Sequence, residues 1–271
     1  MQPILFFDSG LGGLTILREA RLKLPELPFV YVADRAKFPY GTQEATTLKT
    51  YIIELFSKLL ERFNPALSIL ACNTASTLVL EDLRKIYPQY NFVGTVPAIK
   101  PAAAYSQSKM FTVLATERTV KQAYLKKLIH CHAPNYTVNL VGSAKLARMA
   151  EAYLHGDVIC EAEIKQEIQS CFVSLNNKKT DIIVLGCTHY PFLLNHFRKN
   201  APWPVDWLDS AEGVANRIKK ILQESGCLNK NNSQNENACF DRAYFTGTEI
   251  PKTTQRVLQA FGLSPVAEPL K

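Results

Sequence analysis

The chain has 271 residues, of which 47% are hydrophobic and 20% charged, and its formal net charge is +7. This balance excludes a disordered chain, and the length suffices for one large domain or two smaller ones with real cores. The lysines and arginines are scattered, and the small clusters at residues 121–127 and 217–220 have helical spacing. They therefore favour solvated helix faces over a surface that binds nucleic acid.

Cysteine usage and the first residues indicate the cellular compartment. There are seven cysteines, an odd number, with no CxxC motif. The start lacks the basic and apolar regions of a signal peptide, and no apolar run approaches the length of a membrane span. We therefore expect free thiols, a cytoplasmic location and no membrane partner. The HCH stretch at 130–132 is expected to end a helix, because adjacent side chains diverge and suit a metal poorly.

Short apolar runs alternate with helical stretches along the chain. The runs expected to be strands are residues 4–7, 29–33, 67–71, 92–96, 110–115, 136–142, 181–186 and 205–209. The clearest helices are expected at 46–63 and 213–225. Short buried strands joined by helices predict an α/β fold with mainly parallel sheets. Ligands in such folds bind beyond the carboxyl ends of the strands.

The later part of the chain repeats a feature of the first part. In the first part, a strand that ends in small polar residues (FFDSGLGG) is followed by a strand that ends in a cysteine (SILACNTA). In the later part, VLATERT and IVLGCTHY form the same kind of pair. Two similar halves that face each other would place Cys72 and Cys187 on opposite walls of one cleft. Near the C-terminus, the polar stretch 229–238 predicts a surface loop, and residues 242–248 predict an edge strand.

Two cysteines directly follow apolar runs, in ACNTAS and GCTHYP. A structural interpretation makes Cys72 a buried plug, with Asn73 or Thr74 capping a helix at 76–87. A functional interpretation makes Cys72 and Cys187 reactive, since both stand at strand-to-helix turns where a helix dipole favours a thiolate. Each motif taken alone favours the structural interpretation, whereas the pair favours the functional one.

A working thiol base needs more than a helix terminus. The dipole contributes about 0.3–1 kcal/mol, which is less than one pKa unit. His189 stands two residues after Cys187 and is a candidate helper, while Thr188 between them is a candidate helix cap.

Two loops near the N-terminus are candidate ligand sites. DSGLGG at 8–13 lacks the lysine of a phosphate-binding loop, and its simplest interpretation is a tight turn capped by Ser9. Alternatively, Asp8 accepts a proton or binds an amine, and the loop N–H groups bind a carboxylate. FPYGT at 38–42 is a turn in which Tyr40 and the Gly41 N–H group can close over a ligand.

Several motifs in this order resemble those of the glutamate racemases: FDSGLGGLTILRE, YVADRAKFPYG, ACNTAS, VGTVPAIKPAA, LGCTHYP and DSAEGVA. The resemblance covers nearly the whole chain. It implies two pseudo-symmetric α/β lobes with the active site in the cleft between them. Residues 1–97 with 208–271 would form the first lobe, and residues 98–207 the second. It also implies a cofactor-independent isomerase that interconverts L- and D-glutamate and supplies D-glutamate for peptidoglycan.

The resemblance implies roles for individual residues. Cys72 and Cys187 would be the two acid/base thiols, assisted by Asp8, His189 and Glu151. Two thiols suit the reaction, because loss of the α-proton leaves a planar carbanion and inversion needs one base on each face. The residues implied to bind substrate are Asp8, Ser9, Tyr40, Gly41, Asn73, Thr74, Thr188 and His189.

No lysine stands in an evident Schiff-base setting, so we do not expect pyridoxal phosphate. The resemblance to cofactor-independent racemases implies that no metal is needed either. The implied partner is L- or D-glutamate, and the sequence leaves open both a homodimer and activation by a cell-wall precursor. Residues 115–119 read ATERT, where many family members have a glycine before the second threonine. The roles of Thr116 and Thr119 therefore stay open.

Three alternative functions remain at this point. A related two-cysteine racemase would act on aspartate or another acidic substrate. A cysteine hydrolase would need one nucleophile with a histidine and would leave Cys72 without a role. A non-enzymatic paralogue would bind a partner and keep the motifs without using them.

Overall fold

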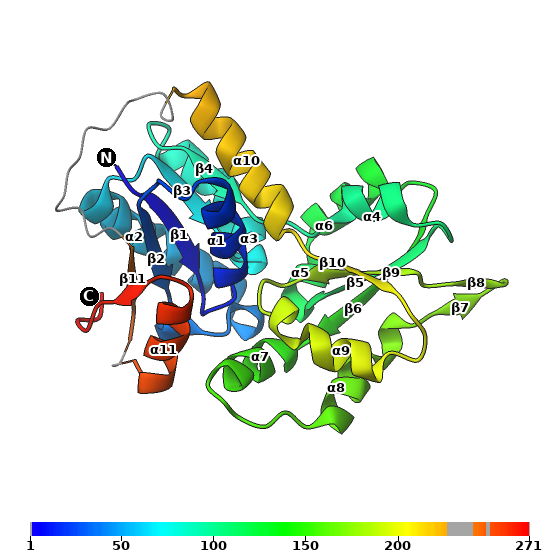
Figure 1. Ribbon diagram of the computed structural model, residues 1–271. Helices are drawn as coiled ribbons and strands as arrows, with labels where there is room; N and C mark the ends of the chain where they lie inside the picture. The colour runs from blue at the N-terminus through cyan, green and yellow to red at the C-terminus, as the bar shows by residue number, and fades with distance from the viewer. Residues whose placement is uncertain (1, 227–240, 248–249, 271) are drawn as a thin grey trace. The chain divides into compact units, whose positions relative to one another are not determined.

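The structure is a computed structural model that describes residues 2–226, 241–247 and 250–270. The predicted surface loop at 229–238 lies outside these residues. The chain forms two compact units (Figure 1). The first unit comprises Met1–Thr95 with Ala211–Lys271, and the second comprises Val96–Ser210.

The first unit contains a six-stranded sheet with the strand order β12-β11-β2-β1-β3-β4. All of its strand pairs are parallel, as the sequence predicted. The prediction of an edge strand at 242–248 was wrong, because β11 pairs with β2 on one side and with the two-residue strand β12 on the other. The strands are β1 (Ile4–Asp8), β2 (Phe29–Ala33), β3 (Leu67–Leu70), β4 (Phe92–Gly94), β11 (Arg242–Phe245) and β12 (Ser264–Pro265).

Both faces of this sheet are covered, which explains why its strands are apolar on both sides. On one face, the Phe7 ring packs against Phe56 of helix α2 (Ala45–Phe63), with 4.9 Å between the ring centroids. On the other face, Phe6 meets Phe29 edge-on at 5.4 Å, and the Arg21 guanidinium of helix α1 lies 4.8 Å from the Phe29 ring centroid.

The helices of the first unit follow the amphipathic pattern of the sequence. In α2, buried Leu48, Ile52, Leu55 and Leu59 recur at helical spacing and face the sheet. No helix within the described residues is both long and apolar enough to cross a membrane. The helices are α1 (Leu14–Lys23), α2 (Ala45–Phe63), α3 (Asn73–Ile86), α10 (Ala211–Glu224) and α11 (Lys252–Ala260), with short 3₁₀ turns η1 (Arg35–Lys37) and η2 (Tyr40–Thr42).

The second unit contains a four-stranded parallel sheet with the strand order β10-β9-β5-β6. Its strands are β5 (Met110–Thr116), β6 (Thr137–Ser143), β9 (Ile182–Gly186) and β10 (Asp206–Leu208). The HCH stretch ends helix α6, as the sequence predicted. The helices are α4 (Ile99–Tyr105), α5 (Glu117–Lys121), α6 (Ala123–His132), α7 (Leu146–Leu154), α8 (Glu161–Ile168) and α9 (Leu194–Asn200), with 3₁₀ turns η3 (Gln169–Cys171) and η4 (Tyr190–Leu193).

The second unit also contains a small antiparallel hairpin that the sequence analysis missed. Strand β7 (Ser174–Leu175) pairs with β8 (Lys178–Lys179). Asn176 and Asn177 connect them with φ angles of 50° and 59°. Asparagine tolerates this left-handed conformation better than most residues, and two such residues in a row make the turn that suits a two-residue hairpin.

One carboxylate ties helix α8 to helix α9 in the second unit. Glu161 lies 3.0 Å from Nδ1 of His196 and accepts hydrogen bonds from Lys199 Nζ (3.0 Å) and Asn200 Nδ2 (2.5 Å). These contacts, led by the one with Lys199, lower the pKa of Glu161 from 4.5 to about 2. The ionised carboxylate therefore stabilises the packing of α8 on α9, and helix α9 follows the loop that carries Cys187.

The Glu161→Gln variant should have a lower Tm than the wild type at neutral pH. Because the folded-state pKa lies below the unfolded value, the stabilisation is fully present above about pH 4.5 and fades as the pH falls towards 2. The difference in Tm between the two proteins should therefore shrink between pH 5 and pH 3 in thermal melts. Glu163→Gln on the same helix is the matched control, with little effect expected at any pH. A difference that grows on acidification would contradict the assignment.

Candidate active site

In the first unit, parallel pairing of β1 with β3 brings Asp8 and Cys72 to the same edge of the sheet. Asp8 is fully buried, and its carboxylate accepts the Gly10 N–H group at 2.7 Å. The Ser9 hydroxyl lies 3.8 Å from the Cys72 sulfur and 3.4 Å from Asp8 Oδ1. Three of the residues selected from the sequence therefore form one cluster, with a hydroxyl group between a carboxylate and a thiol.

Helix α3 begins three residues before the predicted start, and Cys72 itself is its N-cap residue. The expectation that Asn73 or Thr74 caps this helix was therefore wrong. Cys72 has extended backbone angles, and its carbonyl already accepts the Ser76 N–H group at 2.9 Å, which is the first bond of the helix. The Cys72 sulfur consequently lies at the positive end of the helix dipole, which favours its thiolate.

Asn73 is the clearest sign of a ligand-binding position in this unit. The residue is only 3% exposed, and neither its amide nitrogen nor its amide oxygen has a hydrogen-bond partner among the described residues. A buried polar group left unpaired costs about 1–3 kcal/mol. An amide in this position, directly after Cys72, can donate a hydrogen bond to a polar molecule and accept one from it. Thr74 follows it and is also buried.

The Tyr40–Gly41 turn lies after β2, and its tyrosine points inward. Tyr40 is 1% exposed, and its hydroxyl donates a hydrogen bond to the Asp34 carboxylate. Burial, followed by the negative charge of Asp34, raises the pKa of Tyr40 well above its ordinary value, and a Cys72 thiolate adds to this rise. Tyr40 is therefore a neutral phenol close to Cys72, and its proton is directed at Asp34. Gly41 is partly exposed.

In the second unit, a carboxylate, an imidazole and a thiol form a chain. Cys187 follows β9 directly, and its sulfur lies 3.9 Å from His189 Nδ1. His189 Nε2 lies 2.9 Å from a carboxylate oxygen of Glu151, which projects from helix α7. All three side chains are largely buried. Glu151 therefore fixes the orientation of the imidazole ring beside the Cys187 sulfur.

Thr188 is buried between Cys187 and His189 but does not cap a helix. The following turn η4 begins at Tyr190, and His189 occupies its N-cap position. The Thr116 hydroxyl accepts the Thr119 N–H group at 3.2 Å and caps helix α5.

The sequence analysis missed Asp34, whose carboxylate hydrogen-bonds to the Tyr40 hydroxyl. Asp34 follows β2 directly, as Cys187 follows β9, and Cys72 stands two residues after the end of β3. A polar residue at the end of a buried parallel strand was the available signal. Asp34 is fully buried, and it accepts hydrogen bonds from Tyr40, Tyr51 and Thr246.

The comparisons with known proteins agree with these observations. Residues 15–217 match the model of the family described as Asp/Glu/Hydantoin racemase. A curated glutamate racemase of Rhizobium meliloti (strain 1021) is 51% identical over 268 residues, which cover 99% of this chain and 95% of that protein.

Solved structures with the same fold include two glutamate racemases that hold ligands. The Escherichia coli enzyme, in complex with L-glutamate and the activator UDP-MurNAc-ala, is 32% identical with a TM-score of 0.85, covering 98% of this chain and 99% of its own. The Francisella tularensis enzyme, in complex with D-glutamate, is 25% identical with a TM-score of 0.80, covering 100% and 97%. The chain thus belongs to the Asp/Glu/hydantoin racemase family, among the glutamate racemases. This membership confirms the resemblance found in the sequence motifs.

Gly186→Ala should displace the start of the Cys187 loop. A Cβ atom at Gly186 would lie 2.9 Å from the Ala115 Cβ and 3.3 Å from Pro97 Cγ, so β9 and β5 would have to separate. We expect a loss of about 1–3 kcal/mol in the free energy of unfolding, measured by urea denaturation, together with reduced turnover. Gly213→Ala is the control, because open space surrounds that position in helix α10 and alanine should not destabilise it. Equal stability of the two variants would contradict the close approach.

Proposed function

We propose that this protein is a cofactor-independent glutamate racemase in which Cys72 and Cys187 act on opposite faces of the substrate α-carbon. The observation that carries the proposal is that each unit has a nearly buried cysteine just beyond the carboxyl end of a buried parallel strand, with a polar side chain near its sulfur. Family membership supports glutamate as the substrate.

The chemistry explains why two thiols are needed. Removal of the α-proton gives a planar carbanion, and the new proton must arrive from the other face. In the proposed D-to-L direction, the Cys72 thiolate accepts the α-proton and the Cys187 thiol gives its proton to the opposite face. Cys72 then carries the substrate proton and Cys187 is the thiolate. In the L-to-D direction, the two cysteines exchange roles.

Each thiol needs help to ionise, because a cysteine with a pKa near 8.5 is only a few per cent thiolate at neutral pH. For Cys72, the help comes from the helix α3 terminus and from the Ser9 and Asp8 cluster. For Cys187, the help comes from His189, which Glu151 holds in place. In our proposal these groups also return the two thiols to their starting protonation states after each turnover.

The remaining candidate residues would bind and orient glutamate. The proposed ligands for its two carboxylates and its amine are Ser9, Tyr40, Gly41, Asn73, Thr74, Thr188 and the Asp8 carboxylate. Fixing these groups specifies an acidic amino acid and holds its α-carbon in a reactive position.

The proposed biological role is the supply of D-glutamate for peptidoglycan in the cytoplasm. The Escherichia coli relative binds the activator UDP-MurNAc-ala, which supports control of this chain by a cell-wall precursor as well. A homodimer is part of the same proposal, by analogy with other family members.

Circular dichroism with purified protein and no added cofactor tests the reaction. We expect interconversion of L- and D-glutamate in both directions, and much slower turnover of aspartate. Cys72→Ala and Cys187→Ala should each abolish racemisation, because one face then lacks its acid. Cys131→Ala, at an exposed position on helix α6, is the matched control and should retain activity. Racemisation that requires added pyridoxal phosphate, or a preference for aspartate, would reject the proposal.

Asn73→Ala tests the ligand-binding role of the unpaired amide. Because the variant removes a buried polar group that has no partner among the described residues, its Tm should equal or exceed that of the wild type. Its KM for glutamate should rise about tenfold to a hundredfold, since a lost hydrogen bond to a charged ligand costs about 1.5–3 kcal/mol. A lower Tm with unchanged kinetic constants would instead assign Asn73 a structural role.

A further inference from the structure

The buried carboxylate of Asp34 accepts hydrogen bonds from hydroxyl groups on three separate segments of the first unit. Asp34 Oδ1 accepts hydrogen bonds from Tyr51 on helix α2 (2.8 Å) and from Thr246, the residue after β11. Its other oxygen accepts from Tyr40 at 2.5 Å. Asp34 is fully buried, and a buried charge persists only where hydrogen bonds or an opposite charge compensate it. These hydroxyl groups supply that compensation.

Asp34 and Thr246 also make hydrogen bonds with the backbone at the start of the loop between β2 and Tyr40. The Asp34 N–H group donates to the Asp8 carbonyl at 2.8 Å, which joins the loop to β1. The Thr246 hydroxyl accepts the Ala36 N–H group at 3.2 Å while it donates to Asp34. The loop between β2 and Tyr40 is therefore fixed both to the strand that ends in Asp8 and to the segment after β11.

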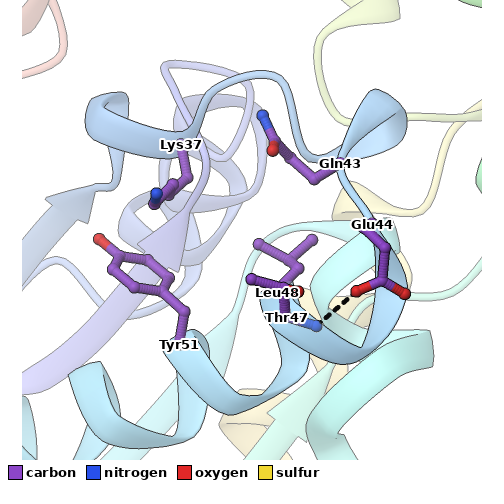
Figure 2. A pocket seen from close by; sticks show the side chains of 6 residues that line it. All are labelled: Lys37, Gln43, Glu44, Thr47, Leu48 and Tyr51. Atoms are coloured by element: carbon purple, nitrogen blue, oxygen red, sulfur yellow. Dashed lines mark hydrogen bonds between the residues drawn. The ribbon is translucent and has the colours of Figure 1, made fainter.

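Tyr51 joins this network from the solvent side. Its ring helps to line a pocket of about 180 Å³, shown in Figure 2, together with Lys37 and Leu48. The Lys37 ammonium lies 5.5 Å from the Tyr51 ring centroid. The ring thus borders the pocket, whereas its hydroxyl hydrogen-bonds to Asp34.

We infer that Asp34 is a positioning residue for the substrate site, and that it works through Tyr40 and depends on Tyr51 and Thr246. This inference rests on the proposed function, in which the Tyr40–Gly41 turn binds glutamate. The Asp34 carboxylate fixes the Tyr40 phenol close to Cys72 and leaves the phenol oxygen able to accept a hydrogen bond. Thr246 lies 212 residues after Asp34 in the sequence. In this inference it nevertheless helps to position Tyr40 in the substrate site.

The test uses variants that remove one hydroxyl and keep the carboxylate. Tyr51→Phe and Thr246→Val should each raise the KM for both glutamate enantiomers about threefold to tenfold, the equivalent of one hydrogen bond, with kcat changed less than twofold. Asp34→Asn should raise KM further. Tyr90→Phe and Thr50→Val are the matched controls, since they remove hydroxyl groups that hydrogen-bond to Asn64 and to the Thr46 carbonyl on the surface of the same unit.

The measured quantities separate positioning from simple stability. A structural role alone would lower Tm and leave KM unchanged, so KM within twofold of the wild type in both Tyr51→Phe and Thr246→Val would overturn the inference even if Asp34→Asn fails to fold. The rise in Tm on adding D-glutamate measures binding without turnover, and the same two variants should need more glutamate for an equal rise. If the wild type binds glutamate but does not racemise it, the proposed function fails, and this binding comparison still decides the positioning role.

Discussion

The parallel pairing of the strands determines where the candidate site residues lie, because the carboxyl ends of paired strands meet at one edge of the sheet. In the first unit, Phe7 pairs with Leu70, so Asp8 and Cys72 lie just beyond this pair at the same edge of the sheet. In the second unit, Ala115 pairs with Gly186, so Cys187 emerges next to the end of β5. The close approach at Gly186 is part of this constraint, since a larger residue there would push the two strands apart.

The two thiols resemble each other in position but not in surroundings. Cys72 lies at a helix N-terminus beside the Ser9 hydroxyl, whereas Cys187 lies beside an imidazole that a carboxylate holds. A racemase has to run in both directions, yet its two bases need not be tuned by the same groups. In the proposed mechanism, a helix dipole and a hydroxyl group would assist Cys72, whereas the His189–Glu151 pair would assist Cys187.

Much of the fold followed from the sequence, because buried parallel strands give uninterrupted apolar runs such as that of β2, whose predicted and observed limits agree. Other features depended on contacts that no local pattern records. Propensity favoured Asn73 as a cap, but the Cys72 carbonyl makes the first helical bond. The sequence suggested an edge strand at β11 because β12, its outer neighbour, has only two residues. The Asp34 network joins Tyr51 and Thr246 through tertiary packing, so only Asp34 itself carried a signal.

The transfer of hydrogen at the α-carbon tests the two-base account most directly. Racemisation run in heavy water from either enantiomer should give early product that carries deuterium at the α-carbon, while the remaining substrate carries almost none. This result is expected because a thiol holds a single proton, so the thiol that takes the substrate hydrogen cannot deliver it to the other face. Early product that retains the substrate hydrogen would show one base serving both faces and would contradict the account.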